Sequence, residues 1–166
     1  MITVYRNLLS GLEKVLKFLT SILFALMVIV ACIEVFRRYV LGLSFIWADE
    51  LVRFMMIWMT FLGGALGYRK KDLVNFDFVQ NALPAKMKPV GQFVITIVGM
   101  IFAALIVYIG ITFTFSDSVT GQESMCMRIP MSIMYFSIPV GLGAMVLFMI
   151  DDIIAFLRKE WKGDAV

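Results

Sequence analysis

Histidine is absent from this 166-residue chain, and cysteine occurs only twice. Without histidine there are no paired imidazoles to hold a haem between membrane helices, which excludes a b-type cytochrome. Cys32 and Cys126 are too far apart for a CxxC redox pair and too few for a zinc site. The sequence has no glycine-rich phosphate-binding loop. We therefore expect no enzyme activity, no cofactor and no bound metal.

Charged residues are also scarce, at 16% of the chain, whereas hydrophobic residues make up 61% and the mean hydropathy is +0.93. Four apolar runs each have roughly 18 residues or more, enough to cross about 30 Å of hydrocarbon as a helix. Outside a closed barrel, only helices satisfy the backbone polar groups in lipid. The sequence predicts an all-α integral membrane protein in which residues 1–166 form one domain. Its four predicted transmembrane helices are Phe18 to Phe36, Leu51 to Tyr68, Val90 to Phe115 and Met131 to Ile150.

Lysine and arginine are distributed unequally between the two sides of these spans. Eleven lie before the first span, between the second and third, or after the fourth, and four lie on the opposite side. Because basic residues are enriched in cytoplasmic connections, we expect both termini to face the cytoplasm. The net charge of +3 reflects this asymmetry. The basic residues cluster at helix ends and not on one solvated helix face, so we expect no nucleic-acid partner.

Glu34 is the one carboxylate that lies well inside a predicted span, and such residues are functional candidates. At about 1.5 Å per residue it lies roughly 24 Å from Phe18, near the outer boundary of the membrane and not at its centre. Arg37 and Arg38 follow at i+3 and i+4 and can share one helix face with it. We favour a structural ion-pair cluster of these three residues, with a proton or ion relay as the alternative.

The connection after the first span is the richest polar segment. Ser44 can cap a new helical turn, and Trp47 suits the lipid headgroup layer. Asp49 and Glu50 precede Arg53 at i+4 and i+3, and acidic residues are favourable in the first turn of a helix. Two interpretations stay open: an interfacial anchor with a salt-bridged first turn, or a docking surface for the outer loops of a partner.

Small residues inside the spans predict close helix contacts. Gly63 and Gly67 form a GxxxG pattern in the second span, and Gly99 forms a similar pair with Ala103 in the third. The helix that approaches Gly63 belongs either to this chain, which we favour, or to another subunit.

Two further segments carry a structural prediction. Pro139 falls inside the fourth span and frees the carbonyl of Tyr135, which predicts a kink that Gly141 eases. In the connection formed by residues 69–89, apolar residues recur near helical spacing after a basic cluster. This pattern predicts a short helix on the membrane surface, in contact with lipid headgroups, that ends at Pro84.

The order and spacing of many of these residues resemble the small membrane subunit of tripartite ATP-independent periplasmic (TRAP) transporters. The resemblance covers roughly residues 10–160. Two positions depart from the pattern: Gly42 stands where Asn is common in the family, and Asp72 where His is frequent. The residues that carry the resemblance are Arg38-Tyr39, Trp47, Asp49-Glu50, Arg53, Phe61-Leu62-Gly63, Tyr68-Arg69, Asp77, Gly121-Gln122, Ser124, Ile129-Pro130, Tyr135, Pro139 and Gly141.

The resemblance implies a location and a set of partners. Such systems have their membrane subunits in the bacterial inner membrane. A soluble protein captures an organic acid in the periplasm. A large membrane subunit then moves the acid by an elevator-like motion driven by a sodium gradient. The small subunit enlarges the static scaffold and helps to dock the binding protein. For this chain, the docking candidates are then Trp47, Asp49, Glu50, Arg53, Gln122 and Ser124.

The leading hypothesis is therefore a non-catalytic scaffold subunit that packs against a large permease. The alternative hypothesis is a stand-alone homo-oligomeric carrier or channel that uses Glu34. The identity of the organic acid is not encoded in this chain, because the residues that would bind it belong to the other subunits.

Overall fold

Four long helices make up most of the protein in a computed structural model that describes residues 2–70 and 88–157. The described part contains no β-strand. The predicted surface helix falls mainly on residues 71–87, which lie outside the described residues, as does Asp72. The long helices are α1 (Ile2–Val40), α2 (Ala48–Arg69), α4 (Lys88–Thr114) and α7 (Ser137–Leu157), and the short ones are α5 (Asp117–Thr120) and α6 (Ser132–Tyr135).

The predicted number of membrane-spanning helices is confirmed, since four helical segments are long and apolar enough to cross a bilayer. The first of them is much longer than predicted: α1 begins at Ile2, and its candidate span runs over 34 residues, Asn7–Val40. That length corresponds to about 50 Å, well beyond the thickness of the hydrocarbon core. The early start follows from amphipathicity, because Leu9 and Leu16 are buried whereas Lys14 and Lys17 are exposed.

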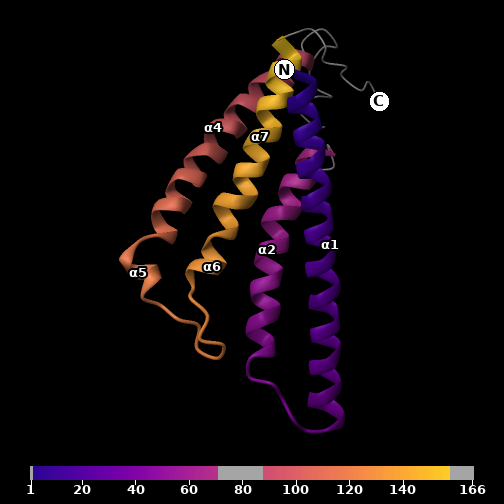
Figure 1. Ribbon diagram of the computed structural model, residues 1–166, viewed down its shortest axis with the longest axis vertical. Coiled ribbons are helices and arrows are strands. Elements are labelled where there is room, and N and C mark those ends of the chain that lie inside the picture. Colours follow the sequence, from indigo (N-terminus) through magenta and orange to yellow (C-terminus); the bar gives the residue numbers. More distant parts are fainter. Residues whose placement is uncertain (1, 71–87, 158–166) are drawn as a thin grey trace.

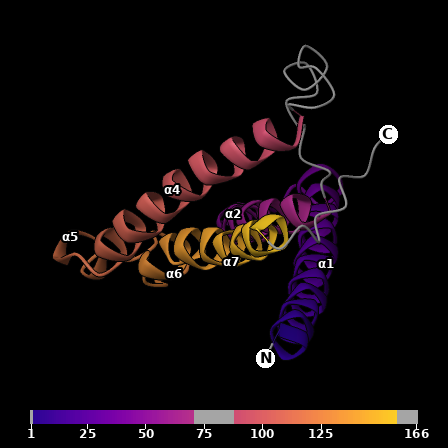
Figure 2. The ribbon, with the colours of Figure 1, turned by 90° about the horizontal axis from the view of Figure 1, so that it is seen from above.

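The four long helices form an open row in the order α1, α2, α7, α4 (Figures 1 and 2). Helix α1 packs on α2, α2 packs on α7, and α7 packs on α4. Since successive spans alternate in direction, the two inner helices, α2 and α7, run parallel. We call the end that carries residues 41–47 and 115–131 the loop end. The opposite end, where α1 begins and α7 finishes, is the terminal end.

The core of the row lies where α1, α2 and α7 meet. Each helix contributes residues at helical spacing, so that one stripe of each is buried. Phe148 is fully buried at the centre of this cluster. The buried residues that compose it are Leu9, Leu16, Leu62, Ala65, Leu66, Ala144 and Phe148.

The closest approach between helices is that of α2 and α7 at Gly141. A Cβ atom added to Gly141 would lie 2.6 Å from Cβ of Phe61 and 2.7 Å from its backbone carbonyl carbon and oxygen. Only glycine therefore fits there without a shift of one backbone. By contrast, a Cβ at Gly63 or Gly64 would meet no atom of the chain within 4 Å. The preferred interpretation, that Gly63 packs against another helix of this chain, is therefore wrong at that residue, and a contact of the motif with another subunit stays a prediction.

Helix α4 is attached to α7 by small residues and stacked aromatic rings. A Cβ at Gly99 would lie 3.3 Å from the terminal methyl of Met149, and Ala103, one turn further along α4, is buried. Near the terminal end, the rings of Phe93 and Phe156 stack with centroids 4.4 Å apart. Gly99 and Ala103 thus face the row.

The fourth span is interrupted near Pro139. Helix α6 finishes at Tyr135 and α7 starts at Ser137, so the break falls at Phe136. Proline cannot donate a hydrogen bond to the carbonyl four residues earlier, which is that of Tyr135. The hydroxyl of Ser137 donates to the carbonyl of Met134 at 2.7 Å across the break. The interruption lies in the first turns of the span.

A polar cluster joins three helices at the terminal end. Arg69 Nη1 of α2 donates to Asp151 Oδ2 of α7 at 2.8 Å, and Arg69 Nε lies 3.7 Å from Glu13 Oε2 of α1. Beside this pair, the Tyr68 hydroxyl donates to Asp152 Oδ2 at 2.9 Å. Arg69 begins the basic cluster of the connection 69–89, and neither aspartate is predicted from the sequence as its partner. The signal available in the sequence was that Asp151 and Asp152 directly follow the fourth apolar run, on the side of the membrane where most basic residues lie.

The Gly141 contact leads to a test of what holds the row together. Gly141→Ala forces the added methyl group into the backbone of Phe61, so we expect a loss of about 1–3 kcal/mol in stability. Gly143→Ala, two residues further along the same helix, adds its methyl group to open space. That variant should be as stable as the wild type or slightly more stable, because alanine favours a helix over glycine. Thermal unfolding in detergent measures both, and equal melting temperatures would contradict the packing argument.

Candidate functional site at the loop end

The first polar element at the loop end is the turn that follows α1. Gly42 has a positive φ of 66°, and the N–H of Leu43 returns to the carbonyl of Arg37 at 3.2 Å. Glycine is the residue best suited to a left-handed conformation after a helix, and asparagine is the next most common choice. An asparagine could adopt the same conformation at this position.

The carboxylate of Glu34 closes this turn. It is 7% exposed and accepts hydrogen bonds from the hydroxyl of Ser44 and from the N–H of Phe45, the latter at 3.1 Å. The expectation that Ser44 caps the next helix is wrong. Helix α2 begins at Ala48 with Trp47 as N-cap and without a side-chain cap, because the Ser44 hydroxyl is bound to Glu34.

The two arginines near Glu34 lie beside the same turn. The guanidinium carbon of Arg37 is 3.7 Å from the ring centroid of Phe45, in cation–π geometry. Arg38 is exposed. Neither Arg37 nor Arg38, whose side chains are both described, forms an ion pair within 4.0 Å of the Glu34 carboxylate. The direct contacts of Glu34 are thus with the turn, and a wider cluster with Arg37 and Arg38 stays a prediction.

A second carboxylate holds the loop that precedes the fourth span. Glu50 Oε2, in the first turn of α2, accepts hydrogen bonds from the N–H groups of Cys126 and Met127, both at 3.1 Å. The Ser124 hydroxyl oxygen accepts from the same N–H of Met127 at 3.3 Å. Ser124 is 2% exposed. Two of the six docking candidates, Glu50 and Ser124, therefore hold the same loop inside the chain.

The loop itself is a short hairpin whose backbone is hydrogen-bonded across its width. Ser124 N–H donates to the carbonyl of Ile129 at 2.9 Å, and Met131 N–H donates to that of Gln122 at 3.0 Å. Arg128 has a φ of 53°, an uncommon conformation for a residue with a side chain, and neighbouring contacts must hold it there. Residues 122–131 therefore form a fixed shape.

Four docking candidates lie on the surface of the loop end. Trp47 is 40% exposed, and Asp49, Arg53 and Gln122 are also exposed. The hairpin adds Met125, which is 97% exposed at its tip and which the sequence analysis did not single out. Together these residues form a surface of mixed charge at one end of the row. We refer to these five residues as the loop-end surface.

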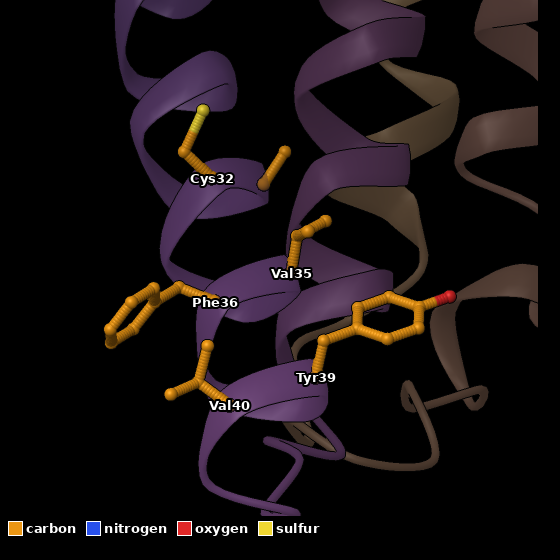
Figure 3. Close-up of a pocket in the computed structure, with 6 residues that line it drawn as sticks. Cys32, Val35, Phe36, Tyr39 and Val40 are labelled. Carbon is orange, nitrogen blue, oxygen red and sulfur yellow. The ribbon is translucent and has the colours of Figure 1, made fainter.

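Hollows in the described part of the chain lie on the outside of the edge helices. A groove of about 430 Å³ on α1 is shown in Figure 3, and a second one of about 280 Å³ lies on α4. Both have walls of mainly apolar side chains. The described residues also contain no group of three or more His, Cys, Asp or Glu side chains that could hold a metal ion. The two grooves are suited to contact with other apolar groups.

Comparison with known proteins agrees with the resemblance drawn from the sequence. Residues 27–159 match the family described as tripartite ATP-independent periplasmic transporters, DctQ component. The C4-dicarboxylate TRAP transporter small permease protein DctQ of Rhodobacter capsulatus is 28% identical over 120 residues, which are 70% of this chain and 52% of that protein. The sialic acid TRAP transporter small permease protein SiaQ of Vibrio cholerae is 23% identical over 153 residues, which are 92% of this chain and 86% of that protein.

A longer relative is also similar. The isethionate TRAP transporter permease protein DctMQ of Oleidesulfovibrio alaskensis is 21% identical over 121 residues, which are 73% of this chain and 19% of that protein. This chain thus spans about a fifth of the isethionate permease and about half of the Rhodobacter protein. The family match includes all four long helices, from the middle of α1 to the end of α7. The chain belongs to the DctQ component family of tripartite ATP-independent periplasmic transporters.

Proposed function

We propose that this chain is the small permease subunit of a TRAP transporter in a bacterial inner membrane and acts there as a non-catalytic scaffold. Its partners are a large membrane subunit, which carries out the transport, and a soluble periplasmic protein that delivers an organic acid. A sodium gradient drives uptake. Membership of the family and the names of the small-permease relatives support this role. The name DctMQ of the longer relative is consistent with a permease partner for this helix set.

The observation that carries the scaffold role is the use of the polar side chains near the membrane. Glu34 is bound within a turn, Glu50 within a hairpin, and Arg69 by two carboxylates. A transport site needs polar groups that face a cavity near the middle of the membrane, with helices broken there. Here the carboxylates and their partners hold helix ends together, and the break at Phe136 lies in the first turns of its span.

We infer that the loop end faces the periplasm. Most lysines and arginines lie in the connections of the terminal end, which favours a cytoplasmic position for that end. The loop-end surface then faces the compartment in which a soluble binding protein diffuses. The three relatives are named for isethionate, C4-dicarboxylates and sialic acid. We accordingly assign an organic acid as the substrate class of the whole transporter.

Reconstitution distinguishes the scaffold from a stand-alone carrier. Liposomes that contain only this chain should show no flux of C4-dicarboxylate or sialic acid above that of empty liposomes, with or without Glu34→Gln. Radiolabelled uptake under an inward sodium gradient is the measurement. Flux through the wild-type chain alone that disappears in Glu34→Gln would establish the carrier and refute the scaffold.

Charge reversal tests the loop-end surface. In the complete transporter, Asp49→Lys and Arg53→Glu should each lower the uptake rate about tenfold, because like charges are brought together in the complex with the binding protein. The melting temperature should stay unchanged, since both side chains are exposed. Asp117→Lys, also exposed at this end but on α5, is the matched control and should retain wild-type uptake.

Glu50→Ala should behave differently from these surface variants. It removes the acceptor of two backbone N–H groups, so it should lower the melting temperature of the chain as well as uptake. Wild-type uptake in both Asp49→Lys and Arg53→Glu would remove the docking role from this surface.

A further inference from the structure

Helix α1 has a broad exposed side at the edge of the row. Its inward side carries Leu9, Leu16 and Glu34, which are buried. At 100° per residue, Ser21, Ala25 and Cys32 fall within about 40° of one another on the roughly opposite side. All three are exposed, and 6% of the most apolar window of this span is buried inside the chain. We call the side marked by these three small residues the outer face of α1.

The groove on α1 opens on this outer face, in the half nearer the loop end (Figure 3). Cys32 contributes a small side chain at its upper part in the view shown, and Phe36 and Tyr39 point away from each other on its two sides. Ala31 also lines the groove. Val35 and Val40 complete the lining, so no charged side chain borders the hollow. An occupant must therefore be apolar and must reach this depth in the membrane.

The opposite edge of the row is built differently. Helix α4 turns its small residues Gly99 and Gly110 towards α7 and leaves large side chains such as Phe102 and Leu105 outside. Acyl chains cover large and small side chains alike, whereas close approach of two helix backbones in a membrane requires small residues at the contact. On α4 the exposed small residues Ala104 and Thr112 lie about 80° apart around the helix, whereas those of α1 fall within about 40° of one another and reach the larger of the two grooves.

We propose that the outer face of α1 seats a transmembrane helix of the large permease subunit, with an apolar side chain of that helix in the groove. This inference rests on the proposed function and adds which helix of this chain faces the partner. It also agrees with the longer relative, in which the region similar to this chain occupies 19% of one polypeptide. The rest of that polypeptide is several times longer than the similar region, and the polypeptide as a whole is named as a permease protein. A lipid molecule or a second copy of this chain is the competing occupant.

Filling the groove tests the inference in the complete transporter. Cys32→Trp places an indole in the groove, and we expect the amount of large subunit that co-purifies with the tagged chain to fall at least about tenfold. Ile109→Trp is the matched control, because Ile109 lines the groove on α4 and is 57% exposed. It should co-purify the wild-type amount. Both positions are exposed, so both variants should insert and keep the wild-type melting temperature.

A photo-crosslinker gives a second measurement that does not depend on loss of binding. Benzoylphenylalanine in place of Ala25 on the outer face should crosslink to the large subunit, whereas the same group in place of Ala104, an exposed alanine of α4, should not. The inference would be overturned if Cys32→Trp co-purified the wild-type amount of large subunit. It would also be overturned if the crosslinker at position 25 gave a product of twice the mass of this chain, or crosslinks to lipid alone. If the wild-type chain itself fails to co-purify with a large subunit, the proposed function fails first.

Discussion

The close approach of α2 and α7 at Gly141 is the constraint on which the rest of the row depends. In lipid, helices gain little from burying apolar surface, so their association relies on backbone proximity and on satisfied polar groups. The contact of Gly141 with Phe61 supplies the first of these. Once α2 and α7 are fixed against each other, α1 can pack only on the free side of α2 and α4 only on the free side of α7.

Helix α2 also provides satisfied polar groups, because polar contacts occur at both of its ends. At the loop end Glu50 binds the hairpin of residues 122–131, and at the terminal end Arg69 binds α1 and α7. These polar groups are used within the chain, and the apolar outsides of α1 and α4 are left for other molecules. These apolar edges are the surfaces that the proposed scaffold role would use.

The sequence predicted the helical class and the four spans because long apolar runs are an unambiguous signal. It did not predict where α1 begins. Residues 2–17 place polar residues between apolar ones, as in an ordinary amphipathic helix, and so lack the continuous apolar run that marks a membrane span. The contacts of Glu50 with the backbone of Cys126 and Met127, and that of Arg69 with Asp151, could not be predicted from the sequence, because each joins residues more than 70 positions apart. The small-residue pattern located several tight positions, but Gly141 makes the closest contact and Gly63 faces open space.

The parallel arrangement of the two inner helices has a geometric consequence. A row in the order α1, α2, α7, α4 consists of two helical hairpins, α1 with α2 and α4 with α7. In order and direction, these hairpins are related as if by a pseudo-two-fold axis that runs along the membrane normal between α2 and α7. Such an axis makes the outer edges topologically equivalent. Any preference of a neighbouring subunit for one edge over the other must therefore be encoded in side chains. A few substitutions could then reverse which edge the neighbour binds.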